Sequence, residues 1–169
     1  MAAERSSTGR AAGSVHQISV SQGGVPKLPV PSATVTATGV EGDRHRNPRI
    51  HGGPQRAVCL FSLEVIERLR TEGHLIAPGT AGENVTLAGL DWSLVRPGAR
   101  LRLGDAVELE VVSYTGPCKT IAECFTGGDF ARIAQRDHPG DSRVYARVLA
   151  TGRIQSGDRV ELVPAPVQV

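Results

Sequence analysis

Cys118 is the side chain of this sequence best suited to chemistry, because of its immediate neighbours. It follows the turn signal Gly116-Pro117 and precedes Lys119, within "SYTGPCKTIAECF". A thiolate is a strong nucleophile and a soft metal ligand, and an adjacent lysine favours the ionised form. A cysteine can also be a small core hydrophobe or half of a disulfide, so the rest of the chain has to decide among these roles.

The other two cysteines have different surroundings. Cys59 lies within the apolar run "AVCLF", and Cys124 lies between "IAE" and Phe125. Both positions predict buried side chains that pack rather than react. Three cysteines without a C-x-x-C pair indicate neither a disulfide framework nor a cysteine-rich zinc site. A regulatory disulfide between Cys118 and Cys124 is compatible with their spacing, which is not diagnostic.

Three polar loops could carry a binding site: residues 42–56, 79–86 and 115–120. The first contains several arginines around "HGG". Glycines let the backbone approach a ligand closely, and arginines bind phosphates or carboxylates in a forked geometry, so this loop suits an anionic cofactor. From local chemistry alone, an ordinary solvated turn is the better explanation of its charges.

The two histidines of the first loop do not form a recognisable metal motif. His45 and His51 are six residues apart, whereas a zincin helix places its histidines four apart. The sequence also contains no G-x-S-x-G, P-loop or G-x-G-x-x-G motif, so serine hydrolase, P-loop and dinucleotide-binding functions have no support.

Short strands must position these loops. Alternating or β-branched runs predict strands at residues 15–20, 33–38 and 57–61, and the glycine- and proline-rich "GGVPKLPVP" predicts a loop. "ARLRLGDAVELEVV" predicts a hairpin that turns at Gly104-Asp105, and "SRVYARVLATGRIQSGDRVELV" predicts another strand pair.

Two helices are expected beside these strands. Ser62 can cap a helix over residues 63–72 that ends at Gly73, and residues 129–136 suit a shorter one. The pattern as a whole predicts a mainly β fold with short helices (α+β), and closure into a β-barrel would leave no exposed edges.

Composition sets limits on partners and location. The chain has 169 residues, 40% of them hydrophobic, and a net charge of +2, which predicts one domain over residues 15–163 between a flexible tail at 1–14 and a short tail at 164–169. Few aromatic residues and no basic block argue against nucleic acid as a partner. The absence of an apolar run of about 20 residues and of a signal peptide predicts a cytoplasmic protein that does not bind a membrane.

Five successive stretches resemble a known family. They are "GVEGDRHRNPRIHGGPQRAV", "PGTAGENVTLAGLDW", "VRPGARLRLGDAVELEV", "GPCKT" and "YARVLATGRIQSGDRVEL". In this order they are similar to blocks of the MOSC domain family, named after the C-terminal domain of molybdenum cofactor sulfurase, and most of all to its small stand-alone bacterial members. The resemblance covers residues 15–163, and the combination of H-G-G, G-E-N and P-C is far more specific than any one motif. It implies a β-barrel-like MOSC fold.

The resemblance also implies a cofactor and its ligands. A molybdopterin-type molybdenum cofactor would lie in a cleft, with Cys118 as the catalytic residue and the metal ligand, and with Lys119 helping to keep the thiol ionised. The residues that would face the pterin and its phosphate are Lys27, His51, Gly52, Gly53, Arg56 and Asn84. Asp43 more plausibly shapes the turn after Gly42, or orients a neighbouring arginine by hydrogen bonding.

Two functions follow from the resemblance. The first is reduction of N-hydroxylated small molecules to amines, with electrons from a separate reductase or ferredoxin-like protein, because the chain contains no flavin, haem or iron–sulfur motif. The second is a role without reductase activity, in which Cys118 carries sulfur as a persulfide or the domain stores or delivers the cofactor. A degenerate domain without cofactor is a third possibility, which the intact cysteine and its loops argue against.

Overall fold

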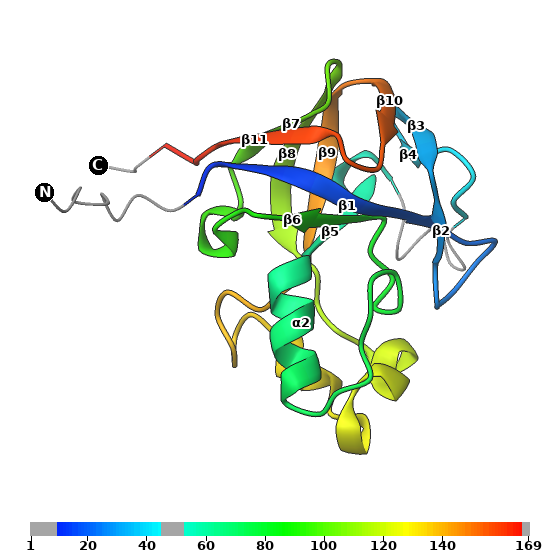
Figure 1. Cartoon of the computed structure of the whole chain (residues 1–169), viewed down its shortest axis with the longest axis vertical. Helices are drawn as coiled ribbons and strands as arrows, with labels where there is room; N and C mark the ends of the chain where they lie inside the picture. Colours follow the sequence, from blue (N-terminus) through cyan, green and yellow to red (C-terminus); the bar gives the residue numbers. More distant parts are fainter. Residues whose placement is uncertain (1–9, 45–52, 167–169) are drawn as a thin grey trace, which may run out of the picture.

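Seven strands close into a β-barrel in the computed structural model, which describes residues 10–44 and 53–166 (Figure 1). Around the barrel their order is β11, β7, β8, β9, β5, β6, β1, and β1 pairs again with β11 to complete the ring. Every neighbouring pair is antiparallel except β5 with β6, which is parallel. The strands are β1 (Ala12–Val20), β5 (Val58–Ser62), β6 (Val85–Ala88), β7 (Arg100–Leu103), β8 (Val107–Tyr114), β9 (Val144–Ala150) and β11 (Arg159–Val163). The predicted barrel is therefore confirmed.

Four further strands lie outside this ring. β2 (Leu28–Val30) extends the sheet beyond β1, while β3 (Ser32–Thr36), β4 (Gly39–Val40) and β10 (Gly152–Gln155) form a small second sheet in the order β10, β3, β4. In Figure 1 this small sheet lies at the opposite end of the barrel from the helices.

The predicted strands are confirmed with several corrections. The stretch "SRVYARVLATGRIQSGDRVELV" forms three strands, β9, β10 and β11, rather than the predicted pair. β1 begins at Ala12 rather than at residue 15, because its first residues pair with β11 and close the barrel. The prediction of a loop for "GGVPKLPVP" is wrong at Leu28–Val30, which pairs with β1 despite the proline. β6 was not predicted, since "VTLA" is short and its pairing partners are distant in sequence.

Alternating side chains fill the barrel. In the hairpin of β7 and β8, Leu101, Leu103 and Leu109 are buried while the intervening Arg and Glu side chains face outward. This period of two is what the sequence predicted for the turn at Gly104-Asp105, where Gly104 has a positive φ of 62°.

The predicted helix at residues 63–72 is confirmed as α2 (Leu63–Thr71). The Ser62 hydroxyl accepts a hydrogen bond from the Val65 backbone N–H at 3.2 Å, which satisfies one of the unpaired donors of the first turn. Val65, Ile66 and Leu69 form its buried face. The helix ends where Gly73 adopts a positive φ of 101°, as expected for a glycine after a helix.

The other helical segments are short 3-10 helices: η1 (Pro54–Arg56), η2 (Trp92–Leu94), η3 (Lys119–Cys124), η4 (Thr126–Gly128) and η5 (Phe130–Ile133). The helix predicted at residues 129–136 is shorter than expected and takes this tighter form. The positive φ values of Gly127 and Gly128 break the chain just before it, and Asp129 provides no side-chain cap.

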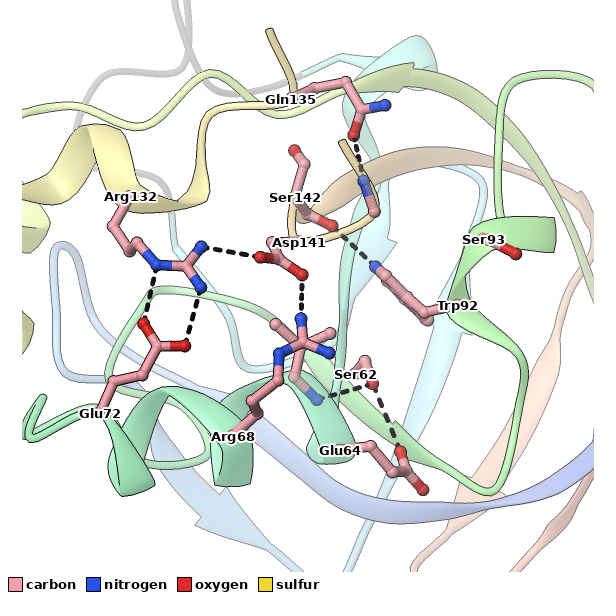
Figure 2. A network of polar contacts seen from close by, with 12 residues as sticks. Ser62, Glu64, Arg68, Glu72, Trp92, Ser93, Arg132, Gln135, Asp141 and Ser142 are labelled. Atoms are coloured by element: carbon pink, nitrogen blue, oxygen red, sulfur yellow. Dashed lines mark hydrogen bonds and ion pairs between the residues drawn. The ribbon is translucent and has the colours of Figure 1, made fainter. Parts of the chain in front are cut away.

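An ionic network fastens this segment to α2 (Figure 2). The Arg132 guanidinium binds Glu72 through two bonds of 2.9 Å and Asp141 at 2.7 Å, and Arg68 also pairs with Asp141. Nearby, the Trp92 indole N–H donates to the Ser142 carbonyl at 2.8 Å. Several side chains here are partly exposed, so each pair contributes modestly, but together they order the chain that follows Cys118.

No helix in residues 10–44 or 53–166 is both long enough and apolar enough to span a membrane.

Gly79 is where the loop at residues 79–86 contacts the turn around Lys27. The Lys27 N–H donates to the Gly79 carbonyl at 2.9 Å, and Gly79 has a φ of 86°. A Cβ at this position would overlap the Lys27 carbonyl oxygen. Only glycine allows the two backbones to approach this closely.

We therefore expect Gly79→Ala to lower the free energy of unfolding by considerably more than Gly140→Ala. Both glycines have positive φ, 86° and 89°, so both substitutions share a conformational cost of about 1–2 kcal/mol. At Gly140 an added Cβ meets nothing within 4 Å in the described chain, whereas at Gly79 the overlap adds about 1–3 kcal/mol. Urea unfolding of the two variants measures the difference, and equal losses would contradict the close approach.

Candidate functional site

The side chains of β5 and β9 divide between two faces. Val58, Leu60, Val144 and Ala146 belong to the hydrophobic core. Cys59 pairs with Tyr145 across the two strands, and Tyr145 also pairs with Ser113 on β8. Because successive residues of a strand point to opposite faces, Cys59 and Tyr145 point away from the barrel interior, and a register shift after Val111 brings Ser113 opposite Tyr145. The polar loops meet on this face.

Contacts to this face come from all three predicted loops. The Arg56 guanidinium carbon lies 5.6 Å from the centre of the Tyr145 ring. From residues 79–86, the Asn84 side-chain oxygen accepts from the Cys59 N–H at 3.0 Å. From residues 115–120, the Thr115 hydroxyl lies 3.8 Å from the Cys59 sulfur. Segments far apart in sequence are thus brought together around Cys59 and Tyr145.

Cys118 lies between β8 and η3 and is partly exposed. Its sulfur is 2.8 Å from the Thr120 hydroxyl, and either atom can be the donor. Lys119, the next residue, is exposed. The thiol is therefore accessible to a ligand and has a polar neighbour.

The prediction that Cys59 and Cys124 are buried is confirmed. Burial raises the pKa of both thiols above their ordinary value, so both stay protonated near neutral pH. Cys124 donates to the Thr80 carbonyl at 3.3 Å. All three cysteines are free, and Cys118 is the one that is partly exposed.

Lys27, Asp43 and Asn84 form a buried polar cluster. The Lys27 ammonium contacts both oxygens of the Asp43 carboxylate, at 2.7 and 2.8 Å. The Asn84 amide donates to Asp43 at 2.9 Å, and the Ser21 N–H donates to the same carboxylate at 2.9 Å. Lys27 and Asp43 side chains are only 9% and 3% exposed, so this ion pair is sheltered from water.

This cluster changes the interpretation of the residues expected to meet the cofactor. The ammonium of Lys27 and the amide of Asn84 are directed toward Asp43, so that among the described residues Asp43 binds a lysine rather than an arginine. Their contact with a cofactor stays a prediction. His51 and Gly52 lie outside the described residues, and so does His45. Gly53 is exposed, with a positive φ of 97°, at the start of η1.

The pKa of the Tyr145 hydroxyl reflects the charged groups that lie near it. Burial raises the pKa of its hydroxyl, the thiols of Cys59 and Cys118 add to this effect, and the cations of Arg143 and Arg56 oppose it. The hydroxyl therefore remains a neutral hydrogen-bond donor near both cations and Cys118.

The sequence did not single out Glu83, Arg143 or Tyr145 as site residues. Glu83 is fully buried, accepts from the Thr86 hydroxyl at 3.1 Å, and has its other oxygen without a hydrogen-bond partner in the described chain. Burial raises its pKa from 4.5 to about 6, although hydrogen bonds and Arg143 act in the opposite direction. The "GEN" motif contains Glu83 and could have identified it as a site residue. The sequence spacing gave no indication that Arg143 lies near Cys118.

Two hollows that described residues line lie away from Cys118. The larger, about 650 Å³, is bounded by residues such as Asp105, Arg153 and Asp158, where β8 begins rather than where it ends. A smaller one of about 270 Å³ lies between Trp92, Tyr114 and Ser142. Neither hollow is lined by Cys118. The candidate site is therefore identified by its side chains and not by the shape of the surface.

Protein ligands for a metal are few. Across the part of the chain that the structure describes, no three His, Cys, Asp or Glu side chains are grouped closely enough to hold an ion.

A family model supplies the decisive comparison: the MOSC domain matches residues 47–161. This chain belongs to the MOSC domain family. The MOSC domain found here is 29% identical over 133 residues to the protein YiiM of Escherichia coli (strain K12), covering 76% of this chain and 58% of that protein. It is 33% identical over 144 residues to the uncharacterized protein YflK of Bacillus subtilis (strain 168), covering 83% of this chain and 63% of YflK.

A third relative is a protein of Gibberella moniliformis named "Reductase". Its identity to this MOSC domain is 33% over 136 residues, which is 78% of this chain but 24% of that protein. This chain thus spans about three fifths of each bacterial relative and about a quarter of the fungal one.

Crystal structures agree with the fold. YiiM from Escherichia coli superimposes with a TM-score of 0.66 at 26% identity, covering 95% of this chain and 72% of that one. The YUAD protein from Bacillus subtilis reaches 0.71 at 16% identity, covering 93% and 98%, which supports the fold alone.

We expect Lys27→Met to lower the free energy of unfolding by about 3–5 kcal/mol, because it leaves the buried Asp43 carboxylate without its cation. Arg159→Met is the matched control. Its ion pair with Glu161 is 70% and 54% exposed and is worth at most about 1 kcal/mol. Chemical unfolding of both variants measures the difference, and a small loss for Lys27→Met would mean that the pair is solvated.

Glu83→Gln should make stability less dependent on pH. With the carboxyl pKa raised from 4.5 to about 6, the folded protein holds this proton more tightly than the unfolded chain, so the free energy of unfolding falls as pH rises through this interval. The shift corresponds to about 2 kcal/mol, which glutamine does not lose. The measured quantity is the free energy of unfolding of the variant minus that of the parent. This difference should be about 2 kcal/mol larger at about pH 7.5 than at about pH 4.

Urea unfolding at both pH values provides this measurement, and comparing differences removes any packing effect of the amide. The exposed Glu161→Gln is the control and should give the same difference at both pH values. A pH-independent difference for Glu83→Gln would refute the raised pKa.

Proposed function

We propose that this MOSC domain binds a molybdopterin-type molybdenum cofactor through Cys118 and reduces N-hydroxylated small molecules to amines. The observation that carries the proposal is the contrast among the cysteines. Cys118 is partly exposed beside polar loops, while Cys59 and Cys124 are buried and protonated. Thiolate is the soft ligand that suits a redox-active metal.

The residues present fit such a group. At Gly116, two residues before the thiol, an added Cβ would meet nothing within 4 Å in the described chain, so a ligand can approach the backbone there. The guanidinium of Arg56 and the neutral Tyr145 hydroxyl lie nearby, and Arg143 has an unpaired buried N–H. Cations and donors of this kind complement an anionic phosphate or a metal–sulfur group.

Different residues of the chain would have different roles. Cys118 would hold the metal, and Arg56 and Lys119, with His51, Gly52 and Gly53, would bind the pterin and its phosphate. Lys27 and Asn84 bind Asp43 and so fix the surrounding loops. In this proposal they would also face the pterin from there. The Tyr145 hydroxyl keeps its proton and can donate a hydrogen bond to the substrate.

When bound, the cofactor supplies two-electron redox chemistry, so that an N–OH group, two electrons and two protons yield the amine and water. The electrons would come from a separate reductase or ferredoxin-like protein. The fungal relative named "Reductase" supports a reductive function.

The same thiol supports a second function. A partly exposed cysteine next to the Thr120 hydroxyl also suits a persulfide, in which Cys118 carries sulfur or the domain delivers the cofactor. This alternative requires no electron donor and no substrate turnover.

Cofactor content and turnover distinguish the two functions. The protein is produced in a host that makes molybdenum cofactor, and the metal and the released pterin are quantified. A reductase should contain both in near-stoichiometric amounts and reduce a hydroxylamine with an artificial donor. A sulfur carrier should show a persulfide on Cys118 by mass spectrometry and no turnover, and absence of metal and pterin would refute the reductase.

Cys118→Ser should abolish metal retention and reduction while leaving thermal stability nearly unchanged, because a hydroxyl is a far less acidic and harder ligand in a partly exposed position. Cys124→Ser is the control: it removes a buried thiol, and its hydroxyl can still donate to the Thr80 carbonyl. Molybdenum per protein is the measurement. Equal metal content in Cys118→Ser and the parent would exclude Cys118 as a ligand.

A further inference from the structure

Arg143 is a buried cation in the segment just before β9. The residue is only 6% exposed, and no carboxylate lies within salt-bridge distance of it in the described chain. A buried guanidinium without a paired carboxylate is costly unless its N–H groups are well used. Its contacts therefore indicate why it is there.

The guanidinium joins two of the three polar loops. Nη1 donates to the Ala81 carbonyl at 2.7 Å, and Nη2 donates to the Gly116 carbonyl at 3.4 Å. The first carbonyl belongs to the loop that contains Glu83 and Asn84; the second precedes Pro117 and Cys118. One side chain thus holds the loop at 79–86 against the loop at 115–120.

The Arg143 backbone adds a third tie to the cysteine loop, because its carbonyl accepts from the Thr115 N–H at 2.9 Å. Thr115 and Gly116 are both fixed in this way, and Pro117, whose φ is restricted by its ring, is the sole residue between them and Cys118. The side-chain bond to Gly116 thus acts two residues before the thiol.

The charge of Arg143 also acts on the site. It lowers the pKa of the Cys59 thiol and the Tyr145 hydroxyl against the larger effect of burial, and it attracts the fully buried Glu83 carboxyl from beyond salt-bridge distance. Its Nε and one Glu83 oxygen both lack hydrogen-bond partners among the described residues. The charge of Arg143 therefore acts on the buried groups around Cys59 and Tyr145.

We propose that Arg143 is a positioning residue for Cys118: it fastens the "GPCKT" loop to the "GEN" loop and so fixes where the thiol is presented. The consequence for metal binding rests on the proposed function, but the fastening itself does not. It can be tested in protein free of cofactor.

Arg143→Lys is the most informative variant because it keeps the charge. A lysine is a point donor and cannot span both carbonyls as the guanidinium does. Hydrogen exchange measured by mass spectrometry should become at least about tenfold faster in peptides covering residues 79–82 and 115–120, while α2 and the β7–β8 hairpin exchange as before. Arg143→Met should give the same local pattern, more strongly.

Alkylation by iodoacetamide provides a second readout. In Arg143→Lys the freed loop should expose Cys118, so its alkylation should become about threefold faster, with the buried Cys124 as the internal reference. Arg147→Met, four residues further along and within β9, is the matched control. Arg147 pairs with Glu110 at 3.0 Å and contacts neither loop, so both readouts should stay at the parent level.

Two outcomes would overturn the proposal. Uniformly faster exchange throughout the protein would make Arg143 a general stabilising residue, and unchanged exchange in both loops would show that the bonds to Ala81 and Gly116 fasten nothing. If Arg143→Met does not fold, Arg143→Lys decides. Failure of the metal-binding proposal would leave these results unaffected, so the two ideas can fail separately.

Discussion

The Asp43 carboxylate is the buried charge around which the site is organised. It accepts from the Lys27 ammonium, the Ser21 N–H and the Asn84 amide, and these donors come from separate parts of the chain. Asn84 also links this cluster to β5, because its side-chain oxygen accepts a hydrogen bond from the Cys59 N–H. Leaving a buried carboxylate without partners is costly, so the bonds to Asp43 keep these segments together.

The barrel gives this cluster a rigid support. Pairing of β1 with β11 closes the ring, so that no strand of the barrel keeps an unpaired edge, and the alternating core fills the interior. The polar loops can then vary in chemistry while their ends stay fixed by β5, β6, β8 and β9. Function on such a scaffold depends on what the loops contain, and this MOSC domain places its accessible cysteine in one of them.

Burial assigns different roles to chemically similar groups. Cys59 and Cys124 are protonated packing residues, and Cys118 is accessible, although all three are free thiols. Charged residues follow the same rule: Lys27 is neutralised by Asp43, while Arg143 binds carbonyl groups and keeps its charge available to the site. Desolvation decides which of these groups retains the capacity to bind an anionic or metallic ligand.

Local patterns in the sequence determined much of this protein. The alternation in "ARLRLGDAVELEVV" predicted the hairpin, Ser62 predicted the start of α2, and apolar neighbours predicted the burial of Cys59. Each depends on residues close in sequence, where periodicity and capping act. The family resemblance further marked Cys118 and its loops.

Only the tertiary structure decided which polar groups meet. β6 forms because β5 and β1 lie on either side of it, Lys27 turns toward Asp43, and Arg143 bonds Ala81 and Gly116 across sequence separations of 62 and 27 residues. The sequence of a loop does not show whether its lysine or arginine binds solvent, a carboxylate or a cofactor. The choice follows from the closed barrel, because closure removes water from some of these groups and leaves each one only the partners that the fold brings within reach.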